Sequence, residues 1–194
     1  GRPGIDGVSY VDVDNRGGAR EAARHLCEIG CRTIGCIRAP ETTTTGQDRL
    51  LGFVEGLADE GRALPSRLIA DGDYSEASGG RGMAQLLEQG VDGVFVASDT
   101  MAIGAIKAIK EAGRSVPDDV AIVGFDGFSA SDTASPPLTT LRQPVVQTAA
   151  EAVQILMGVV DGRSSGPQSR ILPVDLVVRA STSRGGEGRG AVQQ

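Results

Sequence analysis

The sequence predicts an α/β fold in which a parallel sheet is flanked by helices on both faces. Short aliphatic runs alternate with amphipathic segments along nearly the whole chain, which is the pattern of repeated strand–helix–strand units. Glycines stand where predicted helices end, at Gly30, Gly61 and Gly113. The 194 residues are enough for one such domain or two small lobes, and because only 3% are aromatic, the core must be aliphatic.

The first half of the chain alternates strictly between predicted strands and helices. Asp14 and Asn15 can cap the first helix, and the third begins near Ser75, because short polar side chains accept hydrogen bonds from the free amides of a first turn. A polar loop, 40–46, precedes the second helix. The expected strands are 8–13, 33–37 and 67–70, and the expected helices are 15–29, 47–60 and 74–89.

The second half continues this alternation and then departs from it. Residues 93–97 form a continuous apolar run typical of a central strand, and a helix at 100–112 and a strand at 120–125 follow. The polar stretch 126–137 is too long for an ordinary connection and indicates a functional loop. The remaining expectations are a crossing at 138–143, a helix at 147–160, a strand at 171–178, and a disordered tail over 181–194.

Charge and hydropathy exclude several classes of protein. The net charge is −6 and the pI is near 4.8, so this segment offers no basic footprint for nucleic acid. No apolar run reaches the roughly 18 residues of a membrane span, and the start Gly-Arg-Pro-Gly is unlike a signal peptide. We therefore expect a cytoplasmic fragment. Gly186 to Gly190 is only superficially like a nucleotide loop, since no strand–helix unit surrounds it.

Three cysteines lie near the single histidine, His25, and they could form either a metal site or reduced thiols. Cys27 and Cys31 are one helical turn apart and Cys36 falls in the next strand, without the CxxC spacing of a zinc site. The odd count argues against a disulfide framework. We expect buried or half-buried reduced thiols, and neither a metal nor a cofactor.

Polar side chains follow the predicted strands at their carboxyl ends, where open parallel sheets bind ligands. A cation, carboxylates, hydroxyls and one aromatic ring together suit a small polyhydroxylated ligand. The candidates are Thr43, Thr45, Arg49, Tyr74, Ser98 and Asp126. No nucleophile with an oriented base stands among them, so we expect no enzyme.

Three of these positions have competing interpretations. Arg49 can instead pair with Asp48 or a residue near Glu55 on a solvated helix face. Asp99, which directly precedes an apolar helix, is expected to cap that helix rather than to contact a ligand. A carboxylate such as Asp126, placed directly after a buried strand, needs a partner, and this favours a role in the site.

Several short motifs follow one another along the chain in a specific order, although each motif alone is a weak signal. The motifs are Val13-Asp14-Asn15, Gly17-Gly18-Ala19, His25-Leu26, Gly30 through Ile37, Arg49-Leu50-Leu51-Gly52-Phe53, Gly72-Asp73, Ser98-Asp99-Thr100-Met101-Ala102-Ile103-Gly104, Val116 through Asp126, and Pro136 through Pro144. With these motifs in this order, the chain over about residues 11–179 resembles the effector-binding part of LacI/GalR-type transcriptional regulators, itself similar to periplasmic sugar-binding proteins.

The resemblance implies a two-lobed clamp of the periplasmic-binding-protein-like type I that closes on a small sugar-like effector. It implies operator DNA as a partner, reached only through an N-terminal helix-turn-helix that this chain lacks. It also implies that residues 1–12 are a remnant of the first lobe and 13–140 the second lobe. Residues 141–169 would then return to the first lobe, and 170–180 would be a final strand that rejoins the second lobe.

The resemblance further assigns roles to single residues. Arg49 matches the family's effector-clamping arginine and Asp126 its hydroxyl-accepting aspartate. Tyr74 matches an aromatic under the ligand, Thr43 and Thr45 fall in a loop that approaches it, and Ser98 replaces a frequent Asn.

The helix at 100–112 carries two apolar surfaces, one more than the sheet can cover. In similar regulators this helix forms a homodimer interface, which here would contain Met101, Gly104, Ala105 and Ala108. The alternative is that a neighbouring helix of the same lobe covers both surfaces.

Two other functions compete with that of a regulator. A periplasmic-type sugar-binding protein of a transport system shares the sheet and its polar rim, whereas the run 136–144 and the motif at 116–120 favour the regulator. A sugar-processing enzyme would differ from both by turning over its ligand.

Overall fold

The computed structural model describes residues 2–3, 6–163 and 166–183, so the stretch 186–190 lies outside the described residues. The described part is a mostly parallel sheet flanked by helices, which confirms the predicted fold class. Its elements are β1 (Tyr10–Val13), α1 (Asn15–Glu28), β2 (Ile34–Arg38), α2 (Thr44–Asp59), a 3-10 turn (Ser66–Leu68), β3 (Ile69–Asp71), α3 (Glu76–Glu88), β4 (Gly93–Val96), α4 (Asp99–Glu111), β5 (Ala121–Asp126), α5 (Ser129–Thr133), β6 (Thr139–Arg142), α6 (Val145–Val160), β7 (Ser169–Leu172) and β8 (Asp175–Val177).

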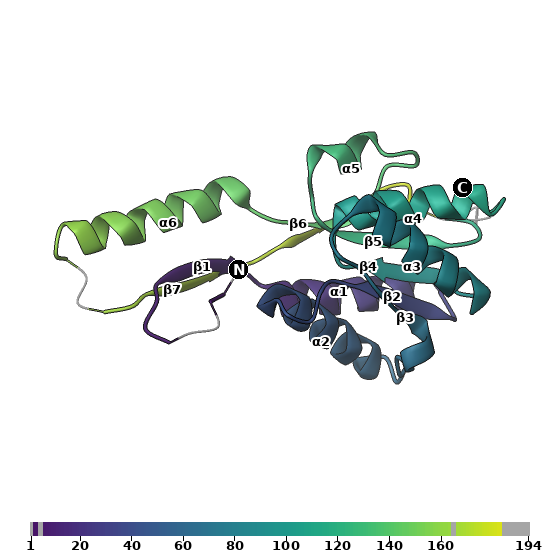
Figure 1. Ribbon diagram of the computed structural model, residues 1–194, viewed down its shortest axis with the longest axis horizontal. Coiled ribbons are helices and arrows are strands. Elements are labelled where there is room, and N and C mark those ends of the chain that lie inside the picture. Colours follow the sequence, from purple (N-terminus) through teal and green to yellow (C-terminus); the bar gives the residue numbers. More distant parts are fainter. Residues whose placement is uncertain (1, 4–5, 164–165, 184–194) are drawn as a thin grey trace, which may run out of the picture.

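Six strands form the main sheet in the order β3-β2-β4-β5-β6-β8, and β8 runs antiparallel to β6. Figure 1 shows α1 and α2 on one side of this sheet and α3 and α4 on the other. The central strands β4 and β5 are buried along their whole length, which explains their continuous apolar sequences. We call this sheet with α1 to α5 the body.

Polar caps and glycines set the boundaries of the helices, and Asp14, Ser75 and the three glycines lie at boundaries that were predicted. The residues whose side chains accept a first-turn amide are Asp14, Thr43, Ser75 and Ser98. Gly30, Gly61 and Gly113 follow their helices with φ of 84°, 70° and 71°, which favour glycine. Because Thr43 caps α2, that helix begins at Thr44, three residues earlier than predicted.

The region after β5 differs most from the sequence prediction. The crossing expected at 138–143 contains a strand, β6, which pairs with β5. The single final strand is two strands, since β7 pairs with β1 and β8 with β6. They are separated at Pro173, which has no amide hydrogen to continue a ladder.

The expectation of a disordered tail is wrong for residues 181–183. Ser181 and Thr182 are buried, and the Ser181 hydroxyl donates to the carbonyl of Ile122 at 2.7 Å. Thr182 Oγ1 lies 2.9 Å from Nε2 of His25 and 2.8 Å from Oγ1 of Thr139. The chain end up to Ser183 is therefore fastened to the body, and the rest of the expected tail lies outside the described residues.

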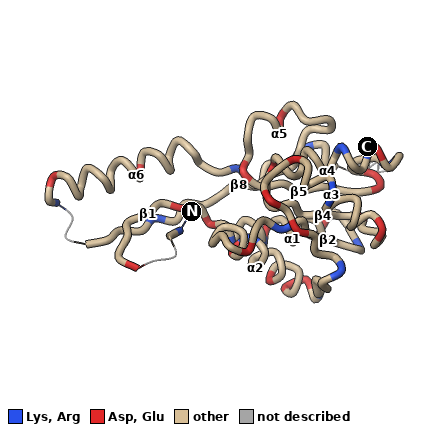
Figure 2. Tube along the Cα trace, viewed as in Figure 1, with Lys and Arg blue, Asp and Glu red and all other residues tan. Residues whose placement is uncertain are grey.

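The elements β1, β7 and α6 extend away from the body, and we call them the arm (Figure 1). The chain passes between arm and body at 13–15, 142–145 and 172–175, which we call the crossover segments. Figure 2 shows that α6 contains almost no charged residues. Most of its apolar side chains are exposed, however: Val145, Val146, Val153, Leu156, Met157, Val159 and Val160.

The cysteines lie as predicted. Cys31 and Cys36 are buried, Cys27 is half-buried, and none forms a disulfide. Burial raises the pKa of the Cys36 thiol to about 12. Among the described residues, no group of His, Cys, Asp and Glu side chains is arranged to hold a metal ion. No helix of the described ranges is long and apolar enough to cross a membrane.

Candidate ligand-binding site

Arg49 is the centre of the candidate site and is only 3% exposed. It projects from α2, where its Nε donates to Oδ1 of Asn15 at 2.8 Å and its guanidinium donates to the carbonyl of Ala97 at 2.6 Å. The guanidinium also covers the ring of Phe125 at 3.7 Å. The alternative of a solvated surface pair is therefore wrong for Arg49.

Asp126, the last residue of β5, is the ionic partner of Arg49. Its Oδ1 lies 3.1 Å from the Arg49 guanidinium and accepts from Nε2 of Gln143 at 2.7 Å. Among the described residues, its Oδ2 has no hydrogen-bond partner. Burial raises the pKa of Asp126, and the Arg49 cation opposes part of this rise. The site therefore holds a largely desolvated ion pair, and Oδ2 of Asp126 is the carboxylate oxygen that can accept a further hydrogen bond.

The backbone at Asp126 is also unusual, with φ of 124°. A residue with a side chain rarely adopts this conformation, so the surrounding contacts must hold it. Gly127 follows with φ of 75°, and a Cβ added there would lie 2.6 Å from the Cα of Arg142. The turn after β5 thus brings the backbone of the second crossover segment directly against the site.

Tyr74 and Thr43 lie together in the segments that follow β3 and β2. The Tyr74 hydroxyl lies 3.2 Å from Oγ1 of Thr43, and Tyr74 adopts a φ of 68° in the turn before α3. Oγ1 of Thr43 donates to the carbonyl of Pro40 and accepts from Gly46, so it is largely occupied by capping α2. Thr45 lies in the first turn of α2 and forms no hydrogen bond with the other five candidates, all of which are described.

Ser98, not Asp99, caps α4. Ser98 is buried and caps α4 through the amide of Met101, so the prediction that Asp99 is the cap is wrong. Asp99 instead accepts from the amides of Gly127 and Phe128, at 2.7 and 3.1 Å, and from two hydroxyls. Burial raises the pKa of Asp99, and these hydrogen bonds oppose the rise. Asp99 therefore fixes the loop that carries Asp126.

The sequence analysis missed two residues of this cluster, Asn15 and Gln143. Asn15 holds Arg49, and Gln143 holds Asp126. Both belong to or adjoin a crossover segment, directly after a strand. The rule that ligand contacts lie at carboxyl ends of strands could have selected both, had it also been applied to the strands that lead to and from the arm.

Most of the residues expected at a dimer interface are buried within the single chain. Met101 and Ala105 are fully buried, and a Cβ on Gly104 would lie 1.9 Å from the carbonyl of Glu76 in α3. Within the chain, α3 packs against this face of α4. Ala108 is half-buried and, with the backbone of Gly104, lines an open groove of about 690 Å³ between α3 and α4.

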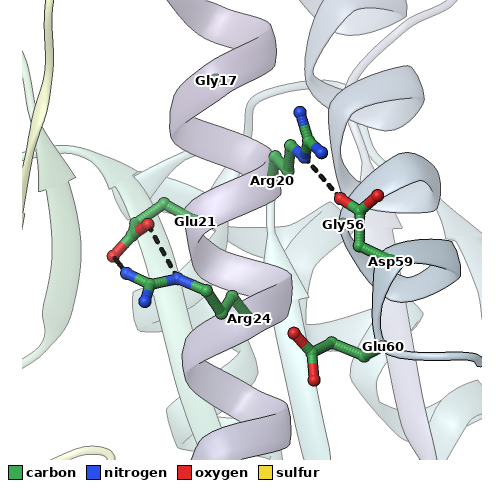
Figure 3. A pocket seen from close by; sticks show the side chains of 7 residues that line it. All are labelled: Gly17, Arg20, Glu21, Arg24, Gly56, Asp59 and Glu60. Atoms are coloured by element: carbon green, nitrogen blue, oxygen red, sulfur yellow. Dashed lines mark hydrogen bonds and ion pairs between the residues drawn. The ribbon is translucent and has the colours of Figure 1, made fainter.

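A charged hollow between α1 and α2 is distinct from the candidate site (Figure 3). Arg20 pairs there with Asp59, and Arg24 pairs with Glu21. Gly56 lets the two helices approach closely, since a Cβ on it would lie 2.6 Å from the carbonyl of Arg20. The Arg20–Asp59 pair therefore links α1 to α2, whereas Arg24 pairs with Glu21 and Glu28 within α1.

Comparisons with known proteins agree with this fold. A family model described as periplasmic binding protein-like domain matches residues 23–182. The HTH-type transcriptional regulator CelR of Thermobifida fusca is 38% identical over 176 residues, 90% of this chain and 52% of that protein. The HTH-type transcriptional repressor CytR of Escherichia coli K12 is 37% identical over 89% of this chain and 51% of that protein. The chain thus spans about half the length of these relatives.

Solved structures give the same result. A complex of transcriptional regulator CelR with cellobiose superposes with a TM-score of 0.90 at 38% identity, covering 93% of this chain and 57% of that one. A LacI family transcriptional regulator from Enterococcus faecium with bound ribose gives 0.82 at 26% identity, covering 93% and 67%. The chain therefore belongs to the family of periplasmic binding protein-like domains, in the form found in LacI-family transcriptional regulators.

Proposed function

We propose that this chain is the effector-sensing region of a cytoplasmic LacI-type transcriptional regulator. It binds a small sugar-like ligand at Arg49 and Asp126, and lobe closure around the ligand changes the affinity of the whole regulator for operator DNA. The observation that carries this proposal is the buried Arg49–Asp126 pair, whose two members are held by Asn15 and Gln143 beside the crossover segments. A ligand that replaces these contacts changes the forces on the connection between body and arm.

The chemistry of the pair suits hydroxyl groups. A guanidinium donates two parallel hydrogen bonds to neighbouring oxygens, Oδ2 of Asp126 accepts from a hydroxyl, and the Tyr74 ring offers a face to the apolar side of a sugar. A buried ion pair contributes little to stability by itself, so stability alone does not explain its position here. The cellobiose and ribose in the two solved relatives support a polyhydroxylated ligand.

The arm is the second part of this proposal. The arm belongs to a first lobe and the body is the second lobe, so the lobe boundaries lie in the crossover segments and β7 belongs to the first lobe. The exposed apolar side of α6 supports this division, because it needs a further layer of chain to cover it. The acidic charge of the chain supports operator contact through a separate segment. The relatives are regulators, which favours this function over sugar transport or sugar processing.

Ligand screening tests the site. Cellobiose or ribose at 100 times its Kd should raise the free energy of unfolding by about 2.7 kcal/mol, measured as a thermal shift. Arg49→Ala or Asp126→Asn should remove this response, because a lost charge-assisted hydrogen bond costs about 1.5–3 kcal/mol of binding. Arg114→Ala and Asp118→Asn, both at exposed positions, are the matched controls. A full response in both site variants would refute the assignment.

We further propose that two copies pair through the groove between α3 and α4. The groove carries Arg81 and Lys107 together with Glu76 and Glu111, so it can meet its own copy across a two-fold axis. A lac repressor dimer, 30% identical with a TM-score of 0.81 and coverage of 89% of this chain and 52% of that one, supports this pairing.

Sedimentation tests the proposed pairing. Ala108→Glu should shift the chain toward monomers in analytical ultracentrifugation, because each new charge meets its copy. Ala112→Glu, at an exposed position just beyond α4, should leave the mass unchanged. Equal masses for the two variants would place the interface elsewhere.

A further inference from the structure

A second hollow, of about 330 Å³, lies at the opposite end of the sheet from Arg49 and Asp126. It is formed where β2 and β3 begin, between the loop after α1 and the segment that joins α2 to β3. Ile34, Leu57 and Leu68, all buried, provide apolar walls. The hollow is therefore separate from the proposed sugar site by the length of the strands.

The rim of this hollow is basic. Arg32, Arg62 and Arg67 line it together with Thr33, and no acidic residue does. Figure 2 shows basic residues on the segment between α2 and β3. The guanidinium of Arg62 is held in place by a 2.6 Å hydrogen bond to the carbonyl of Cys31, whereas Arg32 and Arg67 are exposed. The Thr33 hydroxyl has no hydrogen-bond partner among the described residues.

These arginines differ from the others in the described chain. Ten described arginines form ion pairs and five do not, and three of those five are Arg32, Arg62 and Arg67. In the hollow of Figure 3, by contrast, Arg20 and Arg24 are both paired with carboxylates. The chain has a net charge of −6, yet three cations without an ionic partner surround this one concavity. Their combined positive potential attracts an anionic ligand from solution.

We propose that this hollow binds a small molecule that carries a phosphate group. Guanidinium groups match phosphate oxygens with paired hydrogen bonds, and the Thr33 hydroxyl adds a further donor. The apolar walls take the organic part of the molecule. The concave shape and limited volume favour a small molecule over a nucleic acid backbone. This site is independent of the function proposed above.

Titration with inorganic phosphate and phenyl phosphate tests the proposal, at constant ionic strength with chloride as the reference anion. Amide NMR shifts should localise binding of both to residues 31–34 and 62–68. Phenyl phosphate should bind several-fold more tightly because of the apolar walls. The double variant Arg32→Gln/Arg67→Gln should bind at least tenfold more weakly, since it removes two charge-assisted contacts. Arg114→Gln, which removes an equally unpaired and exposed cation elsewhere, should bind as the parent does.

Three results would overturn the proposal. The first is the absence of phosphate-dependent shifts at these residues, and the second is an equal response of the parent and the double variant. The third is saturable binding of a short DNA duplex through the same arginines at physiological salt, which would make the surface a nucleic acid contact. Because both exposed positions are changed conservatively, the double variant should unfold at the temperature of the parent, and this is the control for folding.

Discussion

The helices α4 and α6 are both rich in aliphatic residues, yet one lies within the body and the other in the arm. Seven of the thirteen residues of α4 are buried, because α3 and the sheet pack against it. Of the sixteen residues of α6, Ile155 alone is buried, and Val146 is 86% exposed. Aliphatic content therefore predicts that a helix forms and that other elements must cover it. Whether its side chains are buried depends on whether this chain contains the helix or sheet that packs against them.

The largest expected effect is a difference in the free energy of unfolding when a glutamate is placed on α4 or on α6. Ala105→Glu on α4 should cost at least about 3 kcal/mol of unfolding free energy, because the carboxylate would be buried without a partner. Ala149→Glu on α6 should change it by less than about 0.5 kcal/mol, since Ala149 is exposed. Urea denaturation followed by circular dichroism measures both. If the two costs were similar, the contrast between body and arm would not hold.

A smaller effect is expected when the arm is made polar. Val153→Lys with Leu156→Lys should reduce binding of a hydrophobic dye such as ANS severalfold, because these side chains are 58% and 60% exposed. The unfolding midpoint of the body should stay the same. Lys110→Gln, a change of an exposed polar residue on α4, serves as the reference and should leave dye binding unaltered.

The smallest expected effect is a pH dependence of stability that comes from His25 in the body. Burial lowers the pKa of His25 below its usual 6.5, so near that pH the unfolded chain binds more protons than the folded one. Stability should therefore fall as the pH drops through 6.5 toward the folded pKa. His25→Gln should flatten this part of the curve of stability against pH. Because His25 is the single histidine, the difference between the curves of the parent and the variant gives the contribution of His25. Parallel profiles between pH 5 and 7.5 would count against burial of a neutral ring.

Local chemistry made much of this structure predictable. Caps such as Ser75 and glycines such as Gly30 act within a few residues, and the carboxyl-end rule brought Arg49, Asp126 and Tyr74 into one region before any contact was known. Thr43 turned out to be a cap as well as a neighbour of Tyr74, because a threonine hydroxyl suits both tasks.

The errors share one cause, which is contact between distant segments. Asp99 fixes a loop nearly thirty residues away, and the Ser181 hydroxyl donates to the carbonyl of Ile122, 59 positions earlier in the chain. A local pattern cannot show such partners. The same limit explains why Asn15 and Gln143 were missed, since each acts on a side chain from another element.

The pairing of β1 with β7 also bears on the order in which the chain folds. The amide of Gln168 donates to the hydroxyl of Ser9 across 159 positions, so these strands close a loop that contains the body from α1 to β6. For an unfolded loop this closure is entropically costly and slow. Once this part of the body has formed, the first two crossover segments already hold the two ends near each other, and little chain entropy remains to be lost. We therefore expect the body from α1 to β6 to form first during synthesis, and the arm and β8 to assemble only after Leu172 has emerged.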